Sequence, residues 1–440
     1  MYGVDDKLLA IFYSLLMLFI AVGIRFMVGT FLIPAGIFAL AWFSFTFFPL
    51  VILFSVPINS LAILYILAAV FLFSLSALPF NWESGFQKNQ MKLLSETAFD
   101  SYFLTMTLYF SAITSLLLSA ITMLINGFTI EQVIFDPIRT SGQYAAVRGN
   151  EGLEYGMMGI LSVMFTYLCP LLGGLRIFAP NRVWFFVVSM APSLFTMLTQ
   201  SSKLVLLVGL CFYVSGVLVA KIYANKLKLP ELSGLLKIVV WGGILFLLTL
   251  ISFVSRLKEF DLGDLGAVVD PLFFSIASYA LGQIYAFADF FSHTIGYPAS
   301  IIFKSEPYSY GAYTFASIFD MLGIGKEFPP GMYDESGLQP NVFETNIFTF
   351  FRGLIYDFGI VGSLIFLFVF GIFAHAVTHR FLTKPYAWFT LATYIVIIVF
   401  IFMGYLFSIF VARYAFLTAL VAWFLLSLNA YLLGYMNCKR

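Results

Sequence analysis

The sequence predicts an all-α polytopic integral membrane protein, with about 11 transmembrane helices along its 440 residues. Hydrophobic residues make up 61% of the chain and charged residues 10%, against about 45–50% and about 25% in soluble domains. Apolar runs of about 20 residues, the length that crosses a bilayer, recur along the chain. This composition excludes a soluble enzyme, a nucleic-acid binder and a disordered protein.

The predicted spans share a continuous apolar core with few charges. No internal repeat, linker or low-complexity segment separates them, so residues 1–440 are treated as a single membrane domain. We expect no disulfide framework from Cys169, Cys211 and Cys438, which fall in spans or in the tail. The spans cover residues 8–24, 30–53, 58–79, 102–125, 154–174, 183–200, 203–221, 237–254, 348–376, 386–405 and 414–435.

Basic residues in the short loops predict that the N-terminus lies outside and the C-terminus inside. In this orientation the inner side carries 13 basic and four acidic residues, and the outer side carries 10 basic and 18 acidic residues. The first apolar run lacks a basic start and a small-residue cleavage site, so no cleavable signal peptide is expected.

Two outer segments are long: a first outer loop at 126–153 and a large outer loop at 255–347, which we expect to contain short helices. The large loop includes an apolar stretch at 271–291. It carries Tyr279, Gln283 and Asp289, which suit an interface better than lipid, and a crossing there would reverse the charge pattern downstream. We therefore interpret it as an outer-surface or re-entrant helix.

Cations at the outer ends of the spans are the main candidates for binding an anion. Such positions are costly in a chain that places cations inside, although snorkelling or pairing with carboxylates such as Glu151, Glu259 or Asp357 would also explain them. The planar fork of arginine suits phosphate oxygens. The cations are Arg139, Arg148, Lys203, Arg256, Lys258, Arg352 and Arg413.

Acid–base candidates on the outer side are fewer. His293 is the only histidine there, and a lone loop histidine is also often incidental. Asp357 could orient Arg352, five residues earlier on a helix, or transfer a proton. The carboxylates Glu151, Glu154 and Asp289 are further candidates. The chain has no metal-ligand motif, so we expect chemistry without a metal or another cofactor.

The aromatic segment 308–315, which contains Tyr313, could hold sugar rings or form a small core of the loop itself. The triplet Asp357-Phe358-Gly359 matches a kinase signature, but neither a Gly-rich loop nor an HRD motif accompanies it. We therefore discount a kinase.

Segment 346–363, which reads NIFTFFRGLIYDFGIVGS, resembles the N-x-[YF]-T…R…DFG-x-x-G pattern of Wzy-type O-antigen and oligosaccharide-repeat-unit polymerases. Residues 311–315 are similar to the G-x-Y-T-F segment of that family, and residues 278–287 to its apolar segment early in the large loop. The ending of the eighth span in Ser255-Arg256 also fits. The resemblance covers most of the chain from about residue 100, whereas the N-terminal third matches only in hydropathy.

Some members carry an arginine and a glycine separated by ten residues in each main outer loop. Arg148 and Gly159 have this spacing, whereas Arg352 and Gly362 are one residue too close. Arg256 has an alanine where the glycine would stand. Lys203 occupies a position after a Thr-x-Ser run that often holds arginine in related ligases and polymerases, and lysine loses the bidentate fork.

The resemblance implies a GT-C-like glycosyltransferase of the bacterial inner membrane, with its active face in the periplasm. It would move a growing glycan en bloc from undecaprenyl diphosphate onto a new lipid-linked repeat unit, producing O-antigen or capsule-type polysaccharide. Implied partners are lipid-linked donor and acceptor glycans, membrane lipids and a chain-length regulator protein, but no nucleic acid. The expected catalytic residues are Arg148, Arg352, Arg256, Asp357, Glu154 and His293, and the expected diphosphate- or glycan-binding residues are Arg139, Lys203, Arg413 and Tyr313.

Three alternatives remain open: an O-antigen ligase that transfers glycan to lipid A-core, a lipid-linked glycan transporter, and a scaffold without activity. Hydropathy does not separate ligase from polymerase, but segment 346–363 favours polymerase. If arginines clamp the diphosphate, Arg148→Ala or Arg352→Ala should abolish long glycans without changing protein level.

Overall fold

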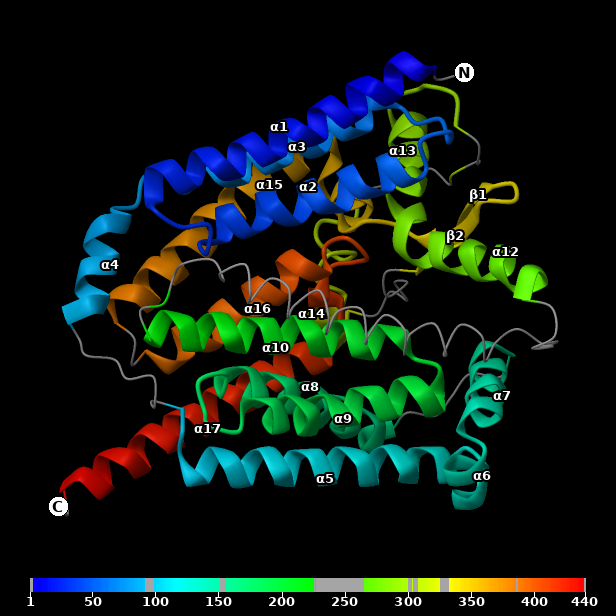
Figure 1. Cartoon of the computed structure of the whole chain (residues 1–440). Coiled ribbons are helices and arrows are strands. Elements are labelled where there is room, and N and C mark those ends of the chain that lie inside the picture. The colour runs from blue at the N-terminus through cyan, green and yellow to red at the C-terminus, as the bar shows by residue number, and fades with distance from the viewer. Residues whose placement is uncertain are drawn as a thin grey trace. The chain divides into compact units, whose positions relative to one another are not determined.

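The computed structural model describes residues 3–91, 99–150, 156–224, 226, 265–299, 303, 308–324, 332–384 and 387–438. The described residues are helical apart from one β-hairpin, turns and short connections (Figure 1). Nine described helices are long and apolar enough to cross a membrane, judged by length and composition. The prediction of a polytopic, largely α-helical membrane protein is therefore confirmed at this level.

Ten of the predicted spans correspond to described apolar helices. Two of these helices, α3 and α16, are shorter than the other eight. The predicted span 237–254 lies outside the described residues. The ten helices are α1 (Val4–Val28), α2 (Pro34–Ile52), α3 (Ser60–Leu75), α5 (Tyr102–Ile125), α8 (Gly156–Leu175), α9 (Arg182–Gln200), α10 (Lys203–Tyr223), α15 (Phe350–Thr383), α16 (Trp388–Met403) and α17 (Arg413–Cys438).

Local sequence explains where several of these helices begin and end. The Asn59 and Ser101 side chains each accept a backbone N–H from the first turn of α3 and α5. Pro34 opens α2, where its missing N–H costs nothing. Gly29 closes α1 with φ of 83°, a left-handed conformation that glycine adopts without steric cost.

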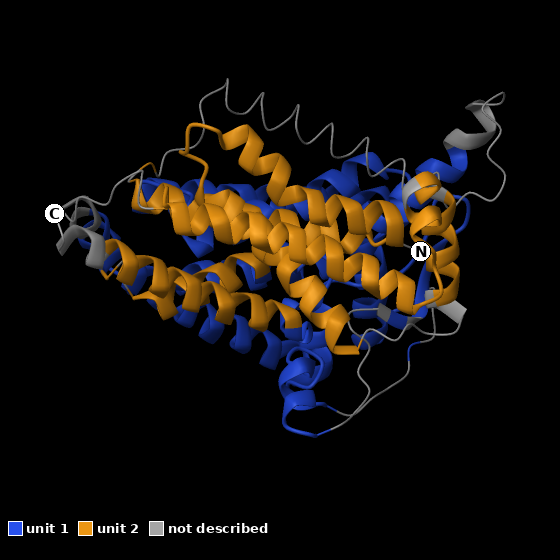
Figure 2. Cartoon of the chain, turned by 90° about the horizontal axis from the view of Figure 1, so that it is seen from below, with its two compact units in different colours: residues 1–87, 269–383, 400–413 blue, residues 88–268, 384–399, 414–440 orange. Residues whose placement is uncertain are grey.

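The chain divides into two compact units, coloured separately in Figure 2. Unit 1 comprises residues 1–87, 269–383 and 400–413, and unit 2 comprises residues 88–268, 384–399 and 414–440. Both units combine segments far apart in sequence, because apolar helix faces pack against whichever neighbours bury them.

In unit 1, α1 packs against α2 and α3, and α15 packs against α3. The further elements of this unit are a π-helical turn (Ala277–Leu281), α13 (Gly282–Thr294), α14 (Ala316–Met321), β1 (Met332–Gln339), β2 (Phe343–Ile347) and a 3₁₀ turn (Ile409–Val411). The helices α4 (Trp82–Met91) and α12 (Leu265–Ile276) each lie partly in unit 1, whose boundaries fall within them. The antiparallel hairpin β1–β2 was not predicted; the expectation for the large loop was that it contains short helices.

The apolar stretch 271–291 was interpreted as an outer-surface or re-entrant helix, but its helical segment is long enough to cross a membrane. It forms α12, the π-helical turn and α13, and the continuous segment Asp270–Thr294 counts among the nine candidate spans. Within unit 1, however, α13 runs across the direction of α1, α2 and α3 instead of along it (Figure 1). This direction supports an outer-surface or re-entrant helix, which stays a prediction.

Hydrogen bonds hold α13 at the end of unit 1 where α1 begins. The Lys7 ammonium donates to Val56 O at 2.7 Å and to Tyr285 Oη at 2.6 Å, and Tyr285 donates to Leu53 O at 3.0 Å. Asn59 donates to Ser292 Oγ at 2.8 Å. These bonds join α13 to α1 and to the turn between α2 and α3.

In unit 2, α8 packs closely against α5, α9 and α10. Gly174 on α8 and Gly216 on α10 bring the two backbones together, because a Cβ at either position would meet backbone atoms of the other helix. The first outer loop is helical in its described part, with α6 (Ile130–Phe135) followed by α7 (Pro137–Asn150).

Candidate functional site

The candidate site lies in unit 1, where α15 bends at Gly359. Gly359 has φ of 70° and ψ of 178°, which is not helical, so a new helical segment begins at Ile360. Conformations of this kind are essentially restricted to glycine. A Cβ at Gly359 would also lie only 3.0 Å from Tyr308 Oη.

Segment 308–315 replaces the helical partners that are lost at this bend. Its Ser309 and Tyr310 N–H groups donate to the carbonyls of Tyr356 and Asp357, both at 3.2 Å. In a continuous helix these carbonyls would accept from residues 360 and 361. The first N–H groups of the new segment therefore begin without helical partners, as at any helix start.

The Asp357 carboxylate fixes the same aromatic segment to α15. One oxygen accepts from Ser309 Oγ at 2.6 Å and from the Tyr313 N–H at 2.9 Å. The other accepts from the N–H and hydroxyl of Thr314 at 2.7 and 2.5 Å. Because Asp357 is fully buried and accepts four hydrogen bonds, its role in the structure is to position this segment.

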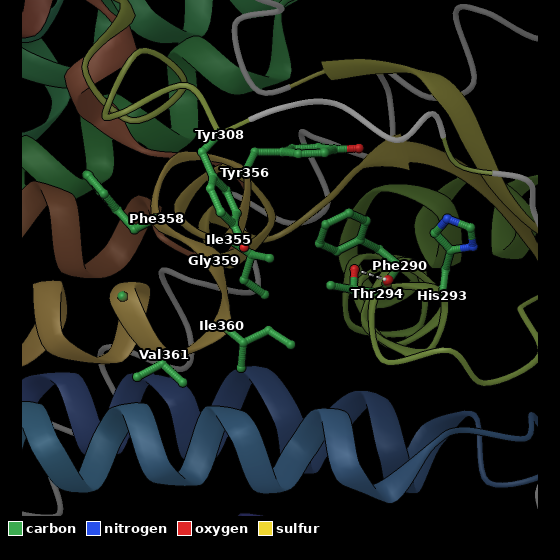
Figure 3. Close-up of a pocket in the computed structure, with 11 residues that line it drawn as sticks. Phe290, His293, Thr294, Tyr308, Ile355, Tyr356, Phe358, Gly359, Ile360 and Val361 are labelled. Atoms are coloured by element: carbon green, nitrogen blue, oxygen red, sulfur yellow. Dashed lines mark hydrogen bonds between the residues drawn. The ribbon is translucent and has the colours of Figure 1, made fainter.

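A cavity of about 550 Å³ opens beside the bend (Figure 3). This volume lies within the range of about 300–1,000 Å³ typical of small-molecule sites. Its lining combines polar side chains with an apolar wall: Phe290, His293, Thr294, Tyr308, Ile355, Tyr356, Phe358, Gly359, Ile360, Val361 and Gly362. The start of the new helical segment thus forms part of this cavity, which we call the bend pocket.

Figure 3 shows how two elements face each other across the bend pocket. Phe290, His293 and Thr294 project from the C-terminal end of α13, while Ile360 and Val361 project from α15. Val361 is 68% exposed, so the apolar wall continues onto the outside of α15. The pocket is therefore amphipathic, with one side suited to polar groups and another to hydrocarbon.

Arg352 lies close to this pocket but does not line it. Its side chain is only 1% exposed, and its Nη2 donates to Glu335 Oε2 on β1 at 2.9 Å. Five aromatic rings surround the guanidinium carbon at centroid distances of 3.7–5.3 Å: Tyr333, Phe348, Phe290, Phe303 and Tyr356. Cation–π attraction and one carboxylate therefore stabilise a buried charge.

Pairing with a carboxylate was the alternative to anion binding for Arg352, and the structure does pair it, but with Glu335 and not with Asp357. Its Nε and Nη1 atoms are buried without hydrogen-bond partners among the described residues. Its Nη2 also donates to Tyr356 Oη at 3.2 Å. Tyr356 thus connects the buried guanidinium to the bend pocket.

Tyr333 on β1 covers the guanidinium most closely. Burial raises the pKa of its hydroxyl well above the usual value, and the positive charge of Arg352 only partly opposes this effect. Tyr333 therefore stays protonated at neutral pH, and Glu335 supplies the negative charge beside Arg352.

The other predicted site residues of unit 1 lie in three separate places. His293 ends α13 and lines the bend pocket. Tyr313 stacks on Tyr356 at 5.1 Å and lines a cavity of only about 10 Å³, which has room for about one water. This favours a role in the core of the loop over sugar binding. Arg413 is exposed and lies 3.8 Å from Asp320.

The remaining predicted site residues belong to unit 2. Arg139 is exposed on α7, and Lys203 is half-buried at the start of α10. Arg148 lies on α7, but its side chain is outside the described part of the structure. Arg256 and Glu154 lie outside the described residues altogether.

Sequence reasoning missed Glu335 and Tyr356. Glu335 lies 17 residues before Arg352, on a hairpin that hydropathy does not reveal. Tyr356 stands one helical turn after Arg352, a spacing at which side chains meet, and this signal could have identified it. Among the described residues, no group of three or more His, Cys, Asp or Glu side chains is placed to hold a metal ion.

These features define a multi-pass helical membrane protein with an amphipathic pocket at a helix bend. No protein-family model, curated protein or solved structure matches the chain.

Proposed function

We propose that this chain is a membrane glycosyltransferase that polymerises polyprenyl-diphosphate-linked oligosaccharide repeat units, with a GT-C-like fold. One observation carries the proposal: residues 355, 356 and 358–362, within the segment that resembles Wzy-type polymerases, line the bend pocket. The segment that suggests the chemistry thus forms part of a cavity of suitable size.

The lining of the pocket suits a lipid diphosphate that carries a glycan. Its polar side includes Tyr308, Tyr356, Thr294, the His293 ring and the first N–H groups of a new helical segment. A helix start favours anionic oxygens. The apolar side continues to exposed Val361 and Ile365 on α15, where a prenyl chain would contact the same surface as lipid.

The reaction would take place where a lipid diphosphate meets water. Departure of the diphosphate builds negative charge, which preorganised donors stabilise. His293 is the acid–base candidate that lines the pocket, and its task would be to accept the proton of the acceptor hydroxyl. Confinement of both lipid-linked substrates to one interface lowers the entropic cost of their encounter.

Charge distribution supports an outer location for the site. The bend pocket lies toward the end of unit 1 where α1 begins with Asp5 and Asp6. Arg25 and Arg380 are at the opposite ends of α1 and α15. The positive-inside rule then favours a bacterial inner-membrane protein with a periplasmic active face.

Reconstitution tests this proposal. The purified full-length chain, incubated with lipid-linked repeat units alone, should produce a ladder of longer lipid-linked glycans. A product that forms only after lipid A-core is added would instead identify a ligase. His293→Gln should slow the formation of longer glycans without weakening the binding of a prenyl diphosphate. It removes the acid–base group and leaves a polar side chain in place of the imidazole ring.

A lipid-linked glycan transporter is the second candidate, and the break of α15 at Gly359 favours it. Transporters often bind substrate at discontinuous helices. In proteoliposomes, movement of the lipid-linked repeat unit across the bilayer without any elongation would support the transporter and reject the polymerase.

A further inference from the structure

We infer that Tyr308 is the side chain on which a sugar ring of the glycan stacks in the bend pocket. The inference rests on the proposed function, because it assigns a place to the glycan of the same substrate. The aromatic segment 308–315 was expected either to hold sugar rings or to form a small core of the loop itself. In the structure, different residues of this segment suit these two roles.

Tyr313 and Phe315 suit the core. The Tyr313 ring stacks on Tyr356 at a centroid distance of 5.1 Å, and the Phe315 ring stacks on Phe410 at 5.3 Å. Each of these rings already has one face covered by another ring. Tyr308, in contrast, is 60% exposed and lines the bend pocket. Tyr308 is therefore the residue of this segment whose ring is open to a ligand in the cavity.

The backbone of the segment explains why Tyr308 lines the bend pocket whereas Tyr313 does not. Tyr310 and Gly311 both have positive φ, 49° and 98°, and turn the chain sharply between the two rings. Ser309, the residue next to Tyr308, is fixed to α15 twice. Its N–H donates to a carbonyl of α15 at 3.2 Å, and its Oγ donates to Asp357 at 2.6 Å.

Gly359 gives the Tyr308 ring its place at the bend. A Cβ at Gly359 would lie 3.0 Å from the Tyr308 hydroxyl oxygen and 3.2 and 3.3 Å from two of its ring carbons. Figure 3 shows the Tyr308 side chain pointing from the aromatic segment toward Gly359. One edge of the ring thus rests on the bend, so the ring is oriented although it is exposed. A ligand that stacks on it restricts little further motion, which lowers the entropic cost of binding.

The chemistry of the ring favours the glycan over the other two parts of the proposed substrate. The face of an aromatic ring carries partial negative charge, which does not suit phosphate oxygens. Hydrocarbon has its own surface at exposed Val361 and Ile365, on the outside of α15. A sugar ring presents an apolar C–H face to an aromatic ring and hydroxyl groups at its edge. His293 and Thr294 supply polar partners for those hydroxyls in the same cavity.

The test compares two soluble probes that differ only in the glycan. One is farnesyl diphosphate, and the other is farnesyl diphosphate that carries the oligosaccharide repeat unit of the cells that produce the chain. Calorimetry measures the binding of each probe to the full-length chain in lipid nanodiscs. We expect Tyr308→Ala to weaken the binding of the glycosylated probe about 10-fold and to leave the affinity for farnesyl diphosphate unchanged, because stacking concerns only the sugar.

Two further variants identify the cause of any loss. Tyr308→Phe keeps the ring and should retain most of the affinity for the glycosylated probe. Tyr310→Ala is the matched control, because it removes a ring of the same segment that is 79% exposed but does not line the pocket. It should change neither affinity. Thermal unfolding of all three variants identifies any loss that comes from misfolding.

The outcomes distinguish the inference from the proposed function. If Tyr308→Ala binds the glycosylated probe as tightly as the unaltered chain, the inference is wrong, and a ladder of longer glycans would still support the polymerase. Equal losses for both probes would also overturn the inference, because Tyr308 would then contact the prenyl diphosphate. If the unaltered chain binds neither probe, both are rejected. A loss confined to the glycosylated probe, in a chain that makes no ladder, would support the glycan site and reject the polymerase.

Discussion

At the residue scale, Asp357 and Arg352 have different roles from those that their spacing suggested. Asp357 was a candidate for proton transfer or for holding Arg352, but its carboxylate accepts four hydrogen bonds from the aromatic segment. Arg352 pairs with Glu335, which comes from a hairpin. The charged partner of Arg352 thus lies 17 residues away in the sequence, and Asp357 does not pair with it.

Asp357→Asn should destabilise the protein, because the amide nitrogen would face two hydrogen-bond donors that need acceptors. We expect a loss of about 2–3 kcal/mol, the cost of leaving buried donors unsatisfied. Thermal unfolding of the solubilised protein measures it. Asp320→Asn is the control, since its exposed pair with Arg413 contributes at most about 1 kcal/mol. Equal stability of both variants would reject the anchoring role of Asp357.

Arg352→Ala should lower stability as well as activity, which replaces the sequence-based expectation of an unchanged protein level. It leaves Glu335 without its cation and empties a cage of five rings, with a cost of about 3–5 kcal/mol. Protein level and unfolding temperature measure the effect. Arg413→Ala, which removes a half-exposed cation, should leave both almost unchanged.

At the element scale, helix packing in unit 2 depends on small residues that hydropathy treats as neutral. A Cβ at Gly174 would lie 2.1 Å from Tyr213 O, and one at Gly216 would lie 2.5 Å from Leu171 O. The contacts are backbone atoms, which cannot rotate away as a side chain could. The close approach of α8 and α10 therefore requires glycine at both positions.

Gly174→Ala should separate α8 from α10 and destabilise the protein by about 1–3 kcal/mol, the usual cost of overpacking. Gly23→Ala is the matched control, because nothing lies within 4 Å of a Cβ there and alanine favours the helix by up to about 1 kcal/mol. Unfolding temperatures of the two variants should shift in opposite directions. A shift in the same direction would reject the packing argument.

At the scale of the whole molecule, the side of the membrane on which the aromatic segment lies depends on whether 270–294 crosses. The charge pattern predicts that residues 308–324 lie outside, which requires that α12 and α13 together do not cross.

Cysteine labelling tests this topology in a Cys438→Ser background, where the remaining Cys169 and Cys211 are buried. Tyr310 is 79% exposed, so Tyr310→Cys should react with an impermeant maleimide in intact spheroplasts. Lys384→Cys should react only after permeabilisation. Labelling of Tyr310→Cys only after permeabilisation, together with labelling of Lys384→Cys in intact spheroplasts, would show that the stretch 270–294 crosses the membrane.

Much of the membrane architecture was predictable, because burial in lipid requires long apolar helices, and hydropathy measures that property directly. Hydropathy by itself does not separate a crossing from a surface helix at 271–291, since the length and composition of this stretch also qualify it as a span. The hairpin β1–β2 was not predictable, since strand formation in two short, polar segments depends on their contacts with the rest of the fold, here with α13.

The amino-acid pattern alone predicts the class of protein, the positions of most spans and the importance of segment 346–363, part of which lines the pocket. Three findings needed the folded chain: Glu335 is the partner of Arg352, Asp357 anchors the aromatic segment, and Tyr356 lines the pocket. The physical reason is the distance along the chain over which each kind of interaction acts. Hydropathy and helical spacing depend on neighbours within a few turns, whereas a buried charge is compensated by whichever groups the folded chain brings beside it.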